Sequence, residues 1–142
     1  MQIDLITSVT PELQSAVRRL IPQLTSRNPP KEDDLVALVQ SDSSSLVVAR
    51  ESGSPIAGMA CVSVYRVPTG VRAIIEDVVV DGPARGKGIG ESLIRRCLEI
   101  ARAKGAEAVT LTSNPRREAA NRLYVRIGFR PRETNSYIYA FS

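Results

Sequence analysis

Apolar residues at the amino-terminal end of the chain follow two different periods. Over residues 2–7 they alternate with polar neighbours, which predicts a short edge strand. From Pro11 they recur at helical spacing and predict a helix that Pro22 ends or kinks. A second, shorter helix is predicted over Lys31–Gln40, after a proline-rich break.

The rest of the chain alternates between strand and helix patterns. The predicted strands are Leu46–Arg50, Ile56–Val67, Val71–Val80, Ala108–Thr112 and Tyr137–Phe141. One helix is predicted from the glycine-rich segment after Val80 to Lys104, and another over Glu118–Ile127. This order predicts an α+β fold with a sheet of mixed direction. At 142 residues we expect a single domain over 1–142.

Composition narrows the chemistry. A net charge of +4 suits an anionic ligand, but the basic residues are spread over several segments without interleaved aromatics, so nucleic acid is not favoured as a partner. The chain has no histidine, and Cys61 and Cys97 fall on apolar positions, so we expect no metal site and two buried thiols. No leader or membrane-spanning run is visible, and a cytoplasmic protein is expected.

The segment from Glu76 to Ser92 reads as a strand, a glycine-rich turn and the start of a helix, an arrangement that binds anions. The dinucleotide pattern G-x-G-x-x-G fails because Glu91 stands where the third glycine is needed. The Walker pattern fails because Lys87 is followed by Gly88 instead of Ser or Thr. The segment is therefore predicted to bind the phosphate or pyrophosphate of a ligand that neither the dinucleotide pattern nor the Walker pattern describes.

Two motifs carry a resemblance to a known family. Arg85-x-x-Gly88-x-Gly90 resembles the pyrophosphate loop of the GNAT N-acetyltransferases, and Ala120–Phe129 is similar to that family's A-N-x-L-Y-x-x-x-G-F helix. The resemblance implies the GNAT fold, with a mixed, mostly antiparallel central sheet and about four helices. It also implies transfer of an acetyl group from acetyl-CoA to a primary amine of a small molecule or peptide, by direct attack in a ternary complex.

The resemblance assigns coenzyme contacts to three segments. Backbone groups of the strand would bond the pantetheine arm, the turn and first helical residues would hold the pyrophosphate, and two asparagines would add contacts. These residues are Val78, Val79, Val80, Arg85, Gly86, Lys87, Gly88, Ile89, Gly90, Glu91, Ser92, Asn114 and Asn121. Ser92 could instead cap its helix, and either asparagine could be a turn or cap residue.

The resemblance also supplies candidates for the chemistry. It implies that Tyr124 protonates the leaving thiolate, although a buried structural tyrosine is the simpler alternative. Glu76 and Asp77 interrupt an apolar strand, and regular alternation would send them to opposite faces, so that only one faces the acceptor. Glu76 is favoured for acceptor binding or base catalysis and Asp77 is the fallback, with a structural ion pair as the alternative.

Three questions stay open at this point. A non-catalytic acyl-CoA-binding regulatory module would carry the same motifs, and consumption of acetyl-CoA with an amine would distinguish the two. The identity of the acceptor, and whether two copies pair into a homodimer through the final strand, are not determined by these patterns.

Overall fold

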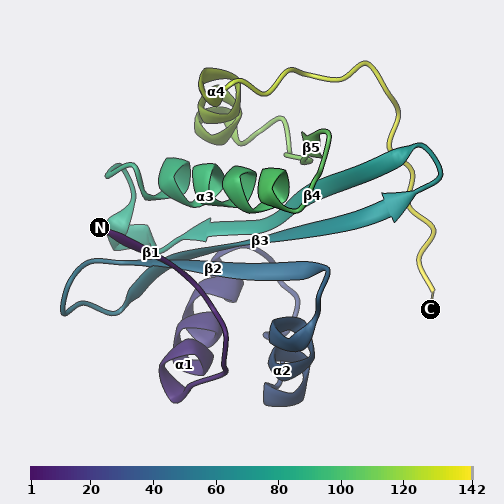
Figure 1. Ribbon diagram of the computed structural model, residues 1–142. Helices are drawn as coiled ribbons and strands as arrows, with labels where there is room; N and C mark the ends of the chain where they lie inside the picture. Colours follow the sequence, from purple (N-terminus) through teal and green to yellow (C-terminus); the bar gives the residue numbers. More distant parts are fainter. Residues whose placement is uncertain (142) are drawn as a thin grey trace. The chain divides into compact units, whose positions relative to one another are not determined.

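The computed structural model describes residues 1–141, which divide into two compact units, Met1–Thr112 and the part of the chain from Ser113 onward (Figure 1). The first unit holds a five-stranded sheet in the order β1-β2-β3-β4-β5. Its strands are β1 (Gln2–Leu5), β2 (Ser44–Arg50), β3 (Ile56–Val67), β4 (Gly70–Val80) and β5 (Val109–Thr110). Neighbouring strands from β1 to β4 are antiparallel, and β5 is parallel to β4.

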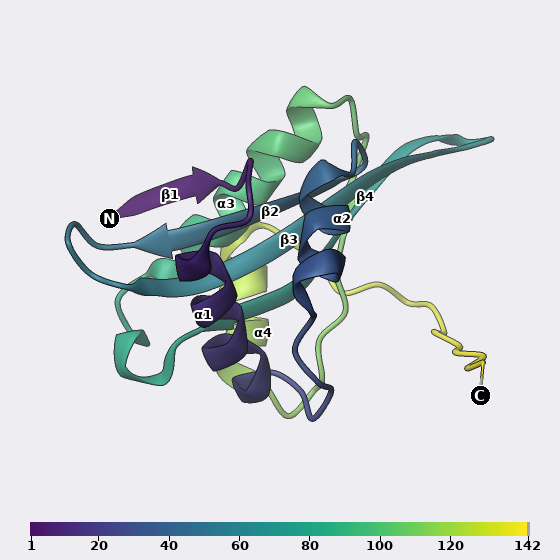
Figure 2. The ribbon, with the colours of Figure 1, turned by 90° about the horizontal axis from the view of Figure 1, so that it is seen from below.

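Helices cover both faces of this sheet. Helix α1 (Pro11–Leu20), the 3-10 turn η1 (Ile21–Gln23) and α2 (Glu32–Gln40) lie on one face, and α3 (Ile89–Ala103) lies on the other (Figure 1). Figure 2 shows α1 and α2 side by side across the strands. The Thr10 hydroxyl accepts a hydrogen bond from the amide of Leu13 at 3.1 Å and so caps α1, and Pro22 converts the continuing chain into the 3-10 turn.

Separate groups of apolar side chains line the two faces. On the α1 and α2 side, Leu13, Val17 and Leu20 pack with strand residues such as Met59 and Val79. On the α3 side, Ile89, Leu93, Ile94 and Cys97 are buried. Gly58 permits the close approach of α3, because a Cβ there would lie 3.1 Å from Leu93 Cδ1 and 3.0 Å from the Val79 carbonyl oxygen. These contacts hold the start of α3 against β3 and β4.

The second unit contains α4 (Glu118–Ile127), which has the predicted bounds. The helix ends at Gly128, whose φ of 126° is a conformation that favours glycine. The amides of Gly128 and Phe129 both donate to the carbonyl of Tyr124, at 3.2 and 2.9 Å, and close the last turn.

Most predicted elements are confirmed, with ends shifted by a few residues: the first strand stops at Leu5, the second helix starts at Glu32, and the predicted strand over Ala108–Thr112 shrinks to β5. One prediction is wrong. Residues Tyr137–Phe141 form no strand, and four of them, Tyr137, Ile138, Tyr139 and Phe141, are 85–93% exposed. Alternating aromatics describe a side-chain pattern, but a strand also needs hydrogen bonds from a neighbouring strand, and the described residues supply none here.

Candidate functional site

The glycine-rich turn joins the end of β4 to the start of α3. It begins with the short 3-10 turn η2 (Gly82–Ala84) and continues through Gly86 and Gly88, whose φ angles are +81° and +80°. A Cβ on either glycine would have none of the described non-neighbouring atoms within 4 Å. Glycine is therefore required by the backbone conformation, and the space outside the turn is open to a ligand.

The first turn of α3 points its unpaired amides toward this space, as any helix start does. Ile89 is itself buried at 2% exposure, so only its backbone could contact a ligand. The Ser92 hydroxyl donates to the Gly88 carbonyl four positions earlier at 3.1 Å, which is a bond within the helix and no cap. Gly88 is the N-cap residue and no side chain caps the helix, so the capping alternative for Ser92 is wrong. Glu91 pairs with Arg95 at 3.0 Å. Gly90 lies within this first turn.

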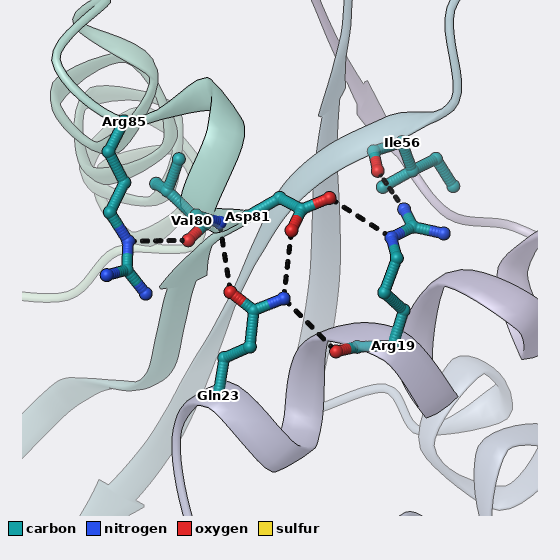
Figure 3. Close-up of polar contacts among 7 residues, drawn as sticks. Arg19, Gln23, Ile56, Val80, Asp81 and Arg85 are labelled. Atoms are coloured by element: carbon teal, nitrogen blue, oxygen red, sulfur yellow. Dashed lines mark hydrogen bonds and ion pairs between the residues drawn. The ribbon is translucent and has the colours of Figure 1, made fainter.

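The basic side chains of the turn are exposed. The Arg85 Nε donates to the Val80 carbonyl at 3.1 Å and so folds back onto the end of β4 (Figure 3). Lys87 lies between the two positive-φ glycines. A positive side chain on each side of Gly86 suits an anionic ligand.

Strand β4 has an open edge just before the turn. Its pairing with β5 covers only Ala73 with Val109 and Ile74 with Thr110. From Ile75 to Val80 the described residues provide no partner strand on that side, while the other side stays paired with β3. Backbone groups of β4 that point away from β3 along this stretch therefore have no strand partner among the described residues, and of these the Val80 carbonyl accepts a hydrogen bond from Arg85 Nε.

A β-bulge interrupts β4 at the acidic pair. Cys61 pairs with Glu76 and Met59 pairs with Val79, so one residue of β3 faces two of β4, and Asp77 has a φ of 55°. The bulge interrupts the regular alternation of side chains along β4. The prediction that the two carboxylates point to opposite faces was based on that alternation and no longer follows. Both are exposed.

The register nevertheless places Glu76. Directly paired residues of an antiparallel ladder carry their side chains on the same face, so Glu76 shares a face with Cys61. Cys61 packs against the apolar cluster formed with α1 and α2. Glu76 therefore lies on the side of the sheet that these two helices cover.

Cys61 is half-buried beside the acidic pair, whereas Cys97 is fully buried. Burial raises the pKa of the Cys61 thiol, and the charges of Asp77 and Glu76 raise it further, to about 11. The thiol is protonated at neutral pH and is a poor nucleophile. Its position in front of the acidic pair was not predicted, because the pattern of the strand does not show which residues lie opposite each other.

The remaining candidates lie in the second unit. Asn114 Oδ1 accepts a hydrogen bond from the Arg116 amide at 2.9 Å, and Asn121 Nδ2 donates to the Asn114 carbonyl at 3.1 Å. The two asparagines therefore stabilise the turn that leads into α4, which was the alternative to a coenzyme contact. Asn121 also lines a shallow hollow along α4 with Arg122, Val125 and Arg126.

Tyr124 is 7% exposed, and its ring meets that of Phe129 edge to face, with centroids 6.0 Å apart. Burial raises the pKa of its hydroxyl above the usual value of 10.0, partly offset by the charge of Arg117. The hydroxyl therefore keeps its proton through the neutral and mildly alkaline range, as a general acid must.

Within residues 1–141, no cluster of three or more Cys, Asp or Glu side chains is arranged to hold a metal ion. No helix in the same part of the chain is both long and apolar enough to cross a membrane.

The sheet, the glycine-rich turn and α4 together identify the class. A model of the acetyltransferase (GNAT) family matches residues 13–129, and the chain belongs to that family. A rice protein named as a probable glucosamine 6-phosphate N-acetyltransferase is 35% identical over 112 residues, which cover 75% of this chain and 64% of the relative. The chain spans between 36 and 64% of the lengths of the curated relatives that it matches.

Solved structures share the fold. An acetyltransferase structure from Trypanosoma brucei superposes with a TM-score of 0.76 at 27% identity, covering 98% of this chain and 100% of that one. A structure from Agrobacterium tumefaciens superposes with a TM-score of 0.85 at 22% identity, covering 99% of this chain and 100% of the other. The α+β fold with a mixed sheet and four helices among the described residues is thus the fold expected for this family.

Proposed function

We propose that this protein is an N-acetyltransferase that moves the acetyl group of acetyl-CoA to a primary amine by direct attack in a ternary complex. One observation carries the proposal: the open edge of β4 runs straight into a glycine turn and the amino terminus of α3, all within one compact unit. An open strand edge offers backbone N–H and C=O groups that can bond the amides of a ligand, and a helix start offers N–H donors for a phosphate. Coenzyme A carries amides in its pantetheine arm and phosphates in its pyrophosphate.

The coenzyme contacts follow from this arrangement. Backbone groups of Val78 to Val80 would bond the pantetheine arm, and those of Gly86 to Gly90 would surround the pyrophosphate, with Arg85 and Lys87 adding positive charge. Glu91 and Ser92 continue the first turn of α3. Asn114 and Asn121 remain proposed contacts.

The proposed chemistry uses Tyr124 and Glu76. Tyr124 would protonate the departing thiolate, for which its raised pKa suits it. Glu76, on the α1 and α2 side of the sheet, would bind the cationic amine or remove its proton through a water, and Asp77 is the nearby second carboxylate. Removal of that proton frees the lone pair that attacks the acetyl carbonyl.

Direct attack is preferred over an acetyl-cysteine intermediate because of Cys61. With a pKa of about 11, its thiol is almost entirely protonated at neutral pH. Cys61→Ser is expected to keep turnover within about twofold, because a residue outside the reaction contributes little to the barrier. Accumulation of acetylated enzyme in the absence of acceptor would overturn direct attack.

For the acceptor we propose an amine that also carries a phosphate group. The support is the name of the rice relative, together with the six arginines that the chain carries after Thr112. Arginine recognises phosphate through two parallel hydrogen bonds.

The two free thiols support a reducing compartment such as the cytoplasm as the location.

We also propose that the protein forms a homodimer. Tyr137, Ile138, Tyr139 and Phe141 are exposed, with the rings of Tyr139 and Phe141 5.6 Å apart, and contiguous apolar surface of this kind usually marks an interaction site. The alternating pattern suits strand addition to a sheet edge of a second copy. Sedimentation of the full chain should show a dimer that Ile138→Lys weakens, and a wild-type protein that stays monomeric at high concentration would contradict it.

The activity is tested by following release of free thiol from acetyl-CoA with a panel of amines. We expect turnover with a phosphorylated amino sugar and weaker turnover with the same sugar lacking phosphate. Tight binding of acetyl-CoA without turnover on any amine would instead support a non-catalytic acyl-CoA-binding module. Absence of acetyl-CoA binding would overturn the proposal as a whole.

A further inference from the structure

A polar network joins the end of α1 to the residue that starts the glycine turn (Figure 3). The Asp81 carboxylate accepts from Arg19 Nε at 3.1 Å and from Gln23 Nε2 at 2.9 Å. Gln23 also accepts from the Gly82 amide through Oε1 at 2.9 Å, and Arg19 donates to the Ile56 carbonyl. A single amide side chain thus bonds both the side chain and the following backbone amide at the end of β4.

Pro22 makes this geometry possible. Because the α-helix stops at Leu20, the 3-10 turn carries Gln23 to a position where its Nε2 also donates to the Arg19 carbonyl at 3.2 Å. That contact orients the Gln23 amide, so its oxygen faces the Gly82 amide and its nitrogen faces Asp81. The network therefore joins residues about sixty positions apart in the sequence.

A simpler explanation would be that the network holds α1 on the sheet, but it is poorly suited to that role. Leu13, Val17 and Leu20 are at most 2% exposed and already anchor that helix. The Arg19 and Asp81 side chains are 36% and 21% exposed, and ion pairs of that kind contribute little to stability.

What the network does determine is the conformation at the base of the turn. The Asp81 amide donates to the Ala57 carbonyl at 2.8 Å, and Arg85 bonds the Val80 carbonyl, so every residue from Val80 to Gly82 has a bonded backbone group. Beyond this base, Gly86 and Gly88 lie exposed in left-handed conformations. The turn thus has a held base and an open tip.

We propose that Arg19, Gln23 and Asp81 are positioning residues that hold the Gly82–Gly88 turn in the conformation that binds the coenzyme's pyrophosphate. The inference rests on the proposed function, since it concerns the same site. Its consequence is that the end of α1 and the 3-10 turn η1, which lie outside both family motifs, control the affinity for acetyl-CoA.

The negative charge of Asp81 and its positioning role predict opposite effects of substitution on the affinity for the coenzyme, which makes the inference testable. Asp81 is an anion close to a proposed anion site, so removing its charge alone would tighten binding of the coenzyme. Loss of the held base would weaken it. Asp81→Ala is therefore expected to raise both the Kd for coenzyme A and the KM for acetyl-CoA about tenfold, the effect of losing hydrogen bonds to a charged group. Asp81→Asn, which keeps one acceptor oxygen, should lose less.

Gln23→Ala should give the same KM increase, with kcat and the KM of the acceptor within about twofold. Glu12→Gln is the matched control, because it removes the ion pair between Glu12 and Arg50 Nη1, which lie 2.6 Å apart, at the start of α1. It should leave the affinity for coenzyme A unchanged.

Binding calorimetry with coenzyme A and steady-state kinetics on the full chain decide the matter. If the wild-type chain binds coenzyme A and the three variants at Asp81 and Gln23 bind it as tightly as wild type, or if Asp81→Ala binds it more tightly, the positioning role is overturned while the proposed function stands. If the wild-type chain does not bind coenzyme A, the proposed function fails and takes this inference with it.

Discussion

The two units of this protein are built on different principles. Every buried apolar side chain identified in the described residues lies in Met1–Thr112, with the exception of Tyr124. Residues 1–112 carry thirteen basic and thirteen acidic residues, whereas residues 113–142 carry six arginines and two glutamates, so the net charge of +4 comes from the last thirty positions. The first unit is organised by a core and the second by charge and exposed aromatics.

This contrast indicates how each unit will respond to substitution. Burial of apolar area dominates folding free energy, so changes in the first unit should appear as changes in stability. Exposed arginine and aromatic side chains contribute favourable interactions mainly when a ligand or a partner protein binds them. Changes in the second unit should therefore appear mainly in binding and turnover.

The largest expected effect is a loss of stability in the first unit. Leu93 is a fully buried residue of α3, and Leu93→Ala should lower the free energy of unfolding by about 2–5 kcal/mol. Val125 is 58% exposed on α4, and Val125→Ala should cost less than about 0.5 kcal/mol. Urea denaturation of both variants measures the difference. Equal losses would remove the contrast between the units.

A large effect on turnover is expected from the second unit. Tyr124→Phe should slow turnover about 100-fold or more if the hydroxyl is the acid, with little change in affinity for acetyl-CoA. Because the pKa of Tyr124 is raised, wild-type activity should not fall from its deprotonation until above about pH 10. Tyr137→Phe, at a residue 90% exposed, is the control. Full turnover by Tyr124→Phe, measured where chemistry limits the rate, would leave only the structural role.

A smaller effect separates strain from function within the first unit. Gly88 and Gly53 have φ angles of +80° and +74° and equally open surroundings, so alanine at either should cost roughly 1–2 kcal/mol of backbone strain. Only Gly88→Ala should also weaken coenzyme A binding, because Gly53 lies in the turn between β2 and β3. Calorimetry and thermal denaturation of the pair test this, and equal affinities would argue against the turn as the binding site.

The smallest effect is a pH dependence in the network at the base of the turn. Hydrogen bonds from Gln23 and Arg19 lower the pKa of Asp81 below its usual value of 3.8, with Gln23 contributing most. A lowered pKa stabilises the fold fully above the unfolded value and loses that contribution as pH falls through the folded one. The stability advantage of wild type over Asp81→Asn should therefore be constant above about pH 5 and vanish in stronger acid. A constant difference down to pH 2 would show that the Asp81 charge does not matter.

The prediction from sequence succeeded where local chemistry decides the structure. The bounds of β3 and α4, the interruption of the first helix at Pro22 and the glycine turn before α3 all follow from apolar periodicity, proline geometry and glycine's backbone freedom. The candidate site residues were assigned from the family resemblance that the two motifs carry. Their roles in catalysis stay predictions.

The errors and omissions arise where distant residues meet. The bulge at Asp77 is visible only in the register between β3 and β4, and it interrupts the regular alternation from which the faces of Glu76 and Asp77 were predicted. Cys61 beside the acidic pair, and Gln23 beneath Asp81, depend on the same packing of separate segments. The final strand failed because its partner is not specified by its own pattern.

The sequence by itself determined the elements, the glycine turn with its anion preference, and the family, because each of these rests on a few neighbouring residues with restricted backbone or side-chain choices. Only the tertiary structure decided which face Glu76 occupies, where β4 loses its partner, and that Arg19 and Gln23 bond Asp81 at the base of the turn. Those properties are pairings between segments up to about sixty positions apart, and no local pattern encodes them.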